Sequence, residues 1–231
     1  MTTFTLTPPV IGILRGVDPG FFAELLPAAF AAGLAAVEVT MNTAGAEKMV
    51  AALRTQVPAG RLLGMGTIRD LEEARRAAAA GAMFFVTPNL DLQVIDFARR
   101  QNIPVVAGAL TPTEVYAAWR AGADMIKVFP CGSLGGPRYI RELRGPFDAI
   151  PLAAVGGVTA DNLGDYLRAG ARAVGVSSSL FGSEALAEKN VDLLTNNVRN
   201  FIKRSSIAAG GEQDPSPLPP PSPGRGGTTD S

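Results

Sequence analysis

The sequence contains no histidine, a single cysteine (Cys131), and no apolar run long enough to span a membrane, which takes roughly 18 residues. The missing histidine excludes imidazole general bases, histidine triads and zinc sites with histidine ligands within this sequence. Acid–base chemistry therefore has to use Glu, Asp, Lys, Tyr or water. One cysteine excludes an intramolecular disulfide.

The sequence also lacks any excess of charge. Its 21 basic residues balance 21 acidic ones, and no basic run is longer than a pair such as Arg75-Arg76. The sequence therefore has no cluster of basic residues of the kind that binds nucleic acid or an anionic membrane. The first residues show neither the charged start nor the apolar stretch of a secretory signal. We expect a soluble, cytoplasmic protein without nucleic-acid or membrane partners.

What is present is a repeated pattern of apolar strands and amphipathic helices, and 47% of the residues are hydrophobic, enough for a sizeable core. A helix end, a glycine suited to a left-handed C-cap and an apolar strand recur four times, in residues 31–39, 79–86, 120–128 and 168–176. Apolar runs bounded by turn residues predict eight strands: 10–15, 36–41, 62–67, 83–87, 104–109, 124–129, 152–156 and 173–178.

Amphipathic segments between these strands predict helices at 19–32, 44–56, 70–80, 91–101, 112–121, 137–144, 160–169 and 183–203. Continuous rather than alternating apolar strands indicate a parallel sheet covered by helices. We predict a (β/α)8 TIM barrel in one domain, residues 1–204. A doubly wound open sheet competes, but no glycine-rich dinucleotide loop follows the first strand. Residues 205–231, rich in Pro, Gly and Ser, are predicted to be a disordered tail.

In such a barrel the chemistry lies at the C-terminal ends of the strands, and polar residues fall there on nearly every strand. Two of them, Glu38 and Lys127, lie inside apolar runs. Lysine is almost never fully buried unless it is paired. One interpretation is a structural salt bridge between Glu38 and Lys127, although buried ion pairs repay their desolvation poorly.

The functional interpretation uses the same desolvation. Apolar surroundings lower the pKa of a lysine, and its neutral amine can then attack a carbonyl and form a Schiff base. A nearby carboxylate with a raised pKa can move protons in the later steps. We therefore predict Lys127 as the nucleophile and Glu38 as the acid/base.

The last two strands offer a phosphate site. Gly156 and Gly157 end the seventh strand and let the backbone approach a ligand, while residues 177–179, all serine, end the eighth. Backbone N–H groups after these two strands commonly cradle phosphate in this barrel. Gly156-Gly157 as a mere tight turn is the alternative. Cys131 has no accompanying base and is interpreted as a small space-filling residue.

The pattern of these motifs resembles the Schiff-base aldolases of 2-keto-3-deoxy-6-phospho sugar acids, over about residues 8–203. The matching stretches, in order, are ILRG (13–16), VEVTMNT (37–43), GMGTI (64–68), VTPN (86–89), IKVFP (126–130), AVGGVT (154–159) and GVSSSLF (175–181). The resemblance implies cleavage to pyruvate and glyceraldehyde 3-phosphate, no metal or other cofactor, and a homotrimer. It implies the following roles: Lys127 for the Schiff base, Glu38 for proton transfer, Arg15 and Thr67 for the pyruvate carboxylate, Pro88 for the pocket wall, and Gly156, Gly157 and Ser178 for the phosphate.

One position departs from the phosphogluconate-cleaving branch, which carries Arg four residues after the catalytic Glu. Here that position is Asn42, and together with Arg15 and the TPN stretch it resembles the phosphogalactonate-cleaving branch. We therefore favour a galactonate-type substrate over its C4 epimer. Activity on 4-hydroxy-2-oxoglutarate stays open, as does a phosphate-binding isomerase or synthase without covalent chemistry. The latter would give no reason for Lys127 midway along its strand.

Overall fold

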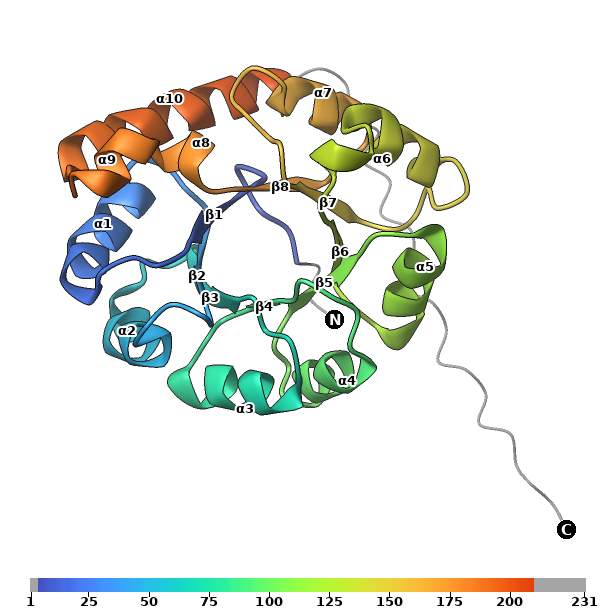
Figure 1. Ribbon diagram of the computed structural model, residues 1–231, viewed down its shortest axis with the longest axis horizontal. Helices are drawn as coiled ribbons and strands as arrows, with labels where there is room; N and C mark the ends of the chain where they lie inside the picture. Colours follow the sequence, from blue (N-terminus) through green and yellow to red (C-terminus); the bar gives the residue numbers. More distant parts are fainter. Residues whose placement is uncertain (1–3, 210–231) are drawn as a thin grey trace, which may run out of the picture.

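In the computed structural model, which describes residues 4–209, eight parallel strands close into a barrel in chain order, and β8 pairs back to β1 (Figure 1). The predicted (β/α)8 barrel is confirmed, and the open doubly wound sheet is wrong. The strands are β1 (Val10–Leu14), β2 (Ala36–Thr40), β3 (Leu62–Gly66), β4 (Phe85–Val86), β5 (Val105–Ala109), β6 (Met125–Val128), β7 (Leu152–Val155) and β8 (Ala173–Val176).

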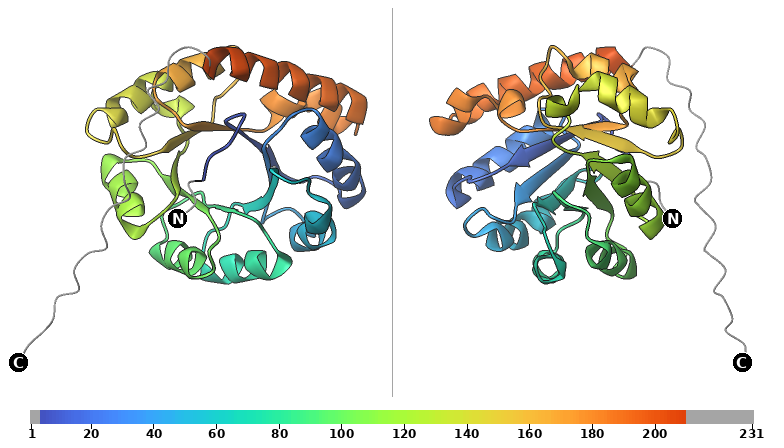
Figure 2. Two further views of the ribbon diagram at one scale, coloured as in Figure 1. Left: turned by 180° about the vertical axis from the view of Figure 1, so that it is seen from behind. Right: turned by 45° about the vertical axis from the view of Figure 1, so that its right-hand side comes forward.

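Helices follow the strands and form a ring around the barrel (Figures 1 and 2). They are α1 (Pro19–Ala31), α2 (Ala46–Leu53), α3 (Leu71–Ala80), α4 (Leu92–Arg100), α5 (Pro112–Ala121), α6 (Pro137–Arg144), α7 (Leu163–Arg168), α8 (Ser178–Phe181), α9 (Ser183–Ala187) and α10 (Val191–Ala209), with 3-10 turns η1 (Arg54–Gln56) and η2 (Gly132–Leu134). Several start as their sequence indicates: Asp18, Asp70 and Asp91 accept N-cap hydrogen bonds, and Thr111 forms a capping box with Glu114.

The C-terminal helical region differs from the prediction of one helix over 183–203. Lys189 takes a left-handed conformation, with φ of 53°, and the chain turns there between α9 and α10. Helix α10 also continues to Ala209, past the predicted domain boundary at residue 204, and Ser205 is buried. The rest of the predicted tail, from residue 210, lies outside the described residues.

The core has two parts, one between barrel and helices and one inside the barrel. The inner part fills the N-terminal end of the barrel, and Phe4 and Leu6 from the segment before β1 pack into it. Side chains alternate along a strand, so residues two positions beyond inner-core members also face the interior. Glu38 follows Ala36 in this way, and Lys127 follows Met125. Both therefore lie inside the barrel, above its apolar plug.

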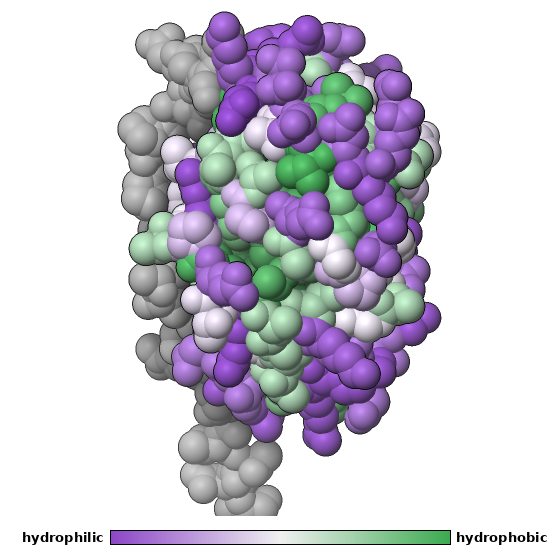
Figure 3. Space-filling view, turned by 90° about the vertical axis from the view of Figure 1, so that its left-hand side faces the viewer, coloured by the Kyte–Doolittle hydropathy of each residue, from purple (hydrophilic) through white to green (hydrophobic). Residues whose placement is uncertain are grey.

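On the side seen in Figure 3, hydrophilic side chains surround smaller apolar patches. Two of the exposed large hydrophobic residues, Phe129 and Leu134, follow β6, at the end of the barrel toward which Lys127 opens. Within residues 4–209 no helix combines the length and the apolar character needed to cross a membrane.

Candidate active site

Two ionisable side chains, Glu38 on β2 and Lys127 on β6, are buried inside the barrel. They are 1% and 5% exposed. Room for the Glu38 carboxylate depends on Gly66, at the end of the neighbouring strand β3. A Cβ atom at Gly66 would lie 2.4 Å from Glu38 Oε1, closer than real contacts allow. Strand β3 therefore ends in a glycine where β2 places a carboxylate.

The two buried groups do not neutralise each other directly. Among the described residues no ion pair joins Lys127 to Glu38, so the purely structural salt bridge considered from the sequence is wrong. Both Glu38 oxygens are buried without a hydrogen-bond partner. Buried polar atoms are rarely left unsatisfied, and such exceptions mark strain, catalysis or a missing ligand. The carboxylate is therefore free to interact with a bound molecule.

Burial shifts both groups toward their neutral forms. Desolvation raises the pKa of Glu38, and the charges of Lys127 and Arg15 oppose that rise only in part. Desolvation likewise lowers the pKa of Lys127; Glu38 opposes this change, and the positive charge of Arg15 adds to it. The site thus favours an unprotonated amine beside a carboxyl group that can carry a proton.

Arg15, directly after β1, joins two other predicted site residues. Its Nη1 donates to Asn42 Oδ1 at 2.9 Å, and its Nη2 donates to Thr67 Oγ1 at 3.2 Å. Thr67 has a φ of 56°, which is unusual for a β-branched residue. Such outliers persist only where the surrounding structure holds them, often at functional sites. The hydrogen bond from Arg15 holds the Thr67 hydroxyl at a defined position in the candidate site.

Pro88 lies beside the strand that precedes Lys127. A Cβ atom at Gly108 would be 2.4 Å from the Pro88 carbonyl carbon, and Gly108 is the register partner of Lys127 across β5 and β6. Thr87 holds the loop there, since its hydroxyl accepts from Gly108 N and donates to the Asn89 carbonyl. Strand β5 contributes no polar side chain; its glycine instead lets the Pro88 loop approach.

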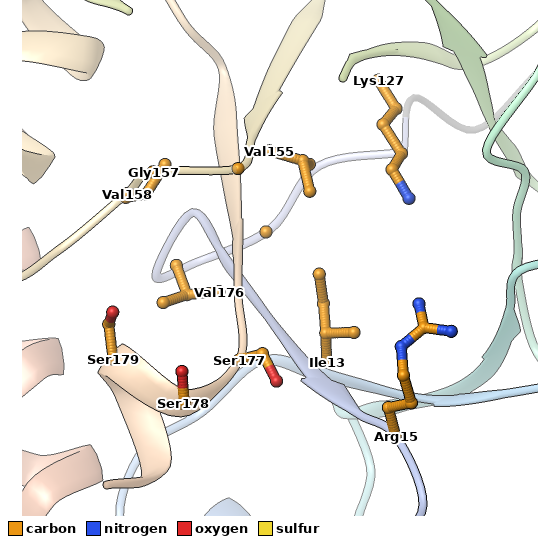
Figure 4. A pocket seen from close by; sticks show the side chains of 12 residues that line it. Ile13, Arg15, Lys127, Val155, Gly157, Val158, Val176, Ser177, Ser178 and Ser179 are labelled. Carbon is orange, nitrogen blue, oxygen red and sulfur yellow. The ribbon is translucent and has the colours of Figure 1, made fainter. Parts of the chain in front are cut away.

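A cavity of about 250 Å³ opens at this end of the barrel. Lys127 and Arg15 reach into it from one side, and Gly157 with the serines of α8 lies on the other (Figure 4). Five predicted site residues line it: Arg15, Lys127, Gly156, Gly157 and Ser178. The lining also includes residues that the sequence analysis did not assign to the site: Ile13, Val155, Val158, Gly175 and Val176. The cavity therefore has the Arg15 guanidinium and the Lys127 amine at one side and is rich in glycine and serine at the other.

The glycine turn after β7 is tied to the loop after β6. Gly132 N donates to the Gly156 carbonyl at 2.9 Å, and Asn162 Nδ2 donates to the Gly157 carbonyl at 2.8 Å. Gly156 and Gly157 both have positive φ, at 94° and 78°. Residues with a side chain rarely adopt this backbone conformation. The two hydrogen bonds hold it in place at the cavity wall.

Cys131 takes no part in the cavity. It is fully buried, and desolvation raises its thiol pKa to about 11, which agrees with a space-filling role. Within the described part of the chain, no three His, Cys, Asp or Glu side chains gather as a metal site requires.

Comparisons with known proteins extend this picture. The family model for KDPG and KHG aldolase matches residues 7–211. A probable 2-dehydro-3-deoxy-6-phosphogalactonate aldolase of Rhizobium meliloti is 36% identical, over 75% of this chain and 82% of its own. A 2-dehydro-3-deoxy-phosphogluconate aldolase of Pseudomonas aeruginosa is also 36% identical, over 69% of this chain and 70% of its own.

Solved structures agree with the sequence relatives. A native KDPGal structure superposes with a TM-score of 0.81 and 32% identity, covering 87% of this chain and 95% of that one. A KDPG aldolase from Legionella pneumophila, with pyruvate captured as a covalent carbinolamine intermediate, gives a TM-score of 0.77 and 26% identity, covering 83% of this chain and 92% of that one.

Proposed function

The chain belongs to the KDPG and KHG aldolase family, and we propose that it is a Schiff-base (class I) aldolase. It reversibly cleaves a 2-keto-3-deoxy-6-phospho sugar acid to pyruvate and glyceraldehyde 3-phosphate. The observation that carries the proposal is the buried Lys127, whose lowered pKa favours the neutral amine and which opens into the cavity near an unpaired Glu38. A non-covalent isomerase or synthase would leave this costly arrangement unused.

In the proposed reaction, neutral Lys127 Nζ attacks the C2 carbonyl of the substrate and forms a carbinolamine. Loss of water gives an iminium, and Glu38 supplies or takes up the protons. Glu38 then takes the proton of the C4 hydroxyl, the C3–C4 bond breaks into the iminium, and the aldehyde leaves. The resulting enamine receives a proton at C3, and water releases pyruvate and free Lys127.

The remaining site residues bind the two charged ends of the substrate. Arg15 and Thr67 hold the C1 carboxylate, because a guanidinium can present a bidentate fork to it. Pro88 forms the wall beside the keto carbon. At the opposite side of the cavity, Gly156, Gly157 and Ser178 bind the phosphate (Figure 4). This assignment places the reacting carbon between the two anionic groups, next to Lys127.

We assign the galactonate-type substrate because Asn42 occupies the position where the gluconate branch carries Arg. Here the Asn42 amide oxygen accepts from Arg15, so the cation beside the reacting carbon comes from β1. Identity alone supports this choice only modestly, since one gluconate relative is as identical as the first galactonate relative, at 36%, although the galactonate match covers more of both chains.

The test is cleavage of both purified epimers and of 4-hydroxy-2-oxoglutarate, with pyruvate release as the readout. Lys127→Met is the control for uncatalysed cleavage. We expect the galactonate-type substrate to have the highest kcat/KM. A preference for the gluconate epimer would overturn the substrate assignment alone. Failure to cleave any of the three would overturn the aldolase proposal.

Two further proposals come from the family resemblance, namely that the chain is a homotrimer and acts in the cytoplasm. Light scattering coupled to size-exclusion chromatography measures the first. A mass of three chains supports it, and a monomer contradicts it. Fractionation of the producing cells tests the second.

A further inference from the structure

The segment that carries Arg15 leaves the barrel immediately after β1. The last residue pair between β1 and β2 is Leu14 with Val39, so no strand ladder holds the backbone of Arg15 and the residue after it. Here a hydrogen bond to a side chain holds the backbone instead. Gly16 N donates to Thr43 Oγ1 at 2.9 Å, from the loop that follows β2.

The Thr43 hydroxyl is itself fixed. It lies 3.0 Å from Thr40 Oγ1, and these two threonines are buried, with exposures of 4% and 0%. Thr43 N also donates to the Thr40 carbonyl at 2.8 Å, which closes the turn between the two residues. The oxygen that accepts from Gly16 N therefore belongs to a buried pair of threonine hydroxyls. A backbone hydrogen bond also holds the turn that carries these two threonines.

We propose that Thr43 is a positioning residue for Arg15, with Thr40 orienting its hydroxyl. Arg15 is exposed and has a long side chain with many rotamers. Its contacts with Asn42 and Thr67 therefore depend on the position of the Arg15 backbone. The anchor lies one residue away, at Gly16, whose φ of 66° turns the chain at this point. The inference rests on the proposed role of Arg15 as the carboxylate-binding cation.

Small displacements matter at such a site, because a misplacement of about 1 Å can reduce the rate on the order of a hundredfold. Thr43→Val keeps the shape of the side chain but removes the acceptor, so the Gly16 N–H loses its partner. Thr43→Ser keeps the hydroxyl. The pair of variants separates the hydrogen bond from the packing.

The experiment is a double-mutant cycle on kcat/KM with the phosphorylated keto-sugar acid, using Thr43→Val, Arg15→Ala and both together. We expect Thr43→Val to lower kcat/KM roughly tenfold, mainly through a higher KM, and Thr43→Ser to stay within about twofold of wild type. With Arg15→Ala already present, Thr43→Val should change kcat/KM by less than about twofold. Thr195→Val, in α10, is the matched control and should leave activity unchanged.

Equal losses from Thr43→Val in the two backgrounds, or no loss in either, would overturn the positioning role while leaving the aldolase proposal intact. Wild-type efficiency in Arg15→Ala would instead remove the proposed role of Arg15, and this inference with it. Thr40→Val provides a second route if Thr43→Val does not fold. It should cost about threefold in the wild-type background and nothing once Arg15 is absent.

Discussion

Replacing both buried ionisable residues by apolar ones should make the protein more stable and inactive. The double variant is Glu38→Leu with Lys127→Met, which keeps approximate side-chain volume. Active sites commonly hold groups that destabilise the fold, because function needs them there. Glu38 and Lys127 fit that description, since both are buried and no ion pair joins them.

The expected magnitude follows from their contacts. The two Glu38 oxygens have no hydrogen-bond partner, and each buried unsatisfied group costs about 1–3 kcal/mol. Burial of the Lys127 amine adds to this cost, because desolvation disfavours its charged form. The attraction between the two charges is the opposing effect; beyond 4.0 Å it stays below about 4 kcal/mol at an effective dielectric constant near 20. We therefore expect the free energy of unfolding to rise by about 1–4 kcal/mol, the gain typical when buried charged groups are replaced by well-packed apolar residues of similar volume.

Urea unfolding measures this change through the midpoint and the slope. Each single variant should gain less than the double variant, because each leaves one buried ionisable group without the other. Circular dichroism checks that the barrel is retained. A double variant that is less stable than wild type by more than about 1 kcal/mol, with the fold intact, would refute the reasoning that these two buried residues reduce stability for the sake of function.

Three further expectations concern charge and metal. The pH above which Lys127 reacts with an amine-specific reagent should rise in Arg15→Met, which removes a charge that lowers the Lys127 pKa, and fall in Glu38→Gln, which removes a charge that raises it; shifts of the opposite sign contradict the electrostatic account. Arg15→Ala should reduce kcat/KM by about 30- to 1,000-fold and Asn42→Ala clearly less, since Arg15 offers the carboxylate a charged donor and Asn42 only a neutral amide; the reverse order would make Asn42 the main carboxylate ligand. Activity should survive dialysis against EDTA, because no three His, Cys, Asp or Glu side chains among the described residues gather as a metal site requires; a loss that Mg²⁺, Mn²⁺ or Zn²⁺ restores would indicate a metal-enolate aldolase.

Local patterns were enough to predict the barrel and the two buried ionisable residues. Apolar runs separated by amphipathic helices imply a parallel sheet, and the period of two along a strand indicates which residues share a face. Glu38 and Lys127 stand out because each breaks an apolar run from within. The contact of Arg15 with Asn42 and Thr67 follows from the same geometry, since ends of neighbouring parallel strands meet at one rim.

The features that were missed depend on neighbours far away in the sequence. Gly66 and Gly108 read as ordinary strand glycines, and only the folded barrel brings the Glu38 carboxylate and the Pro88 backbone against them. The left-handed Thr67 runs against the preference of β-branched residues.

Some predicted boundaries of helices and strands were wrong, again because they depend on neighbours far away in the sequence. Strand β4 keeps only the two residues Phe85–Val86 of the predicted run 83–87. The last helical region breaks at Lys189, where no glycine or proline marks a turn.

The most direct test of the central claim is to trap the Schiff base. Incubation with pyruvate and borohydride should add one reduced pyruvyl group per chain, and peptide mass spectrometry should place it on Lys127. The same treatment of Lys127→Met should leave the protein unlabelled and without aldolase activity. Labelling of a different lysine in the wild type, or full activity in Lys127→Met, would contradict the account.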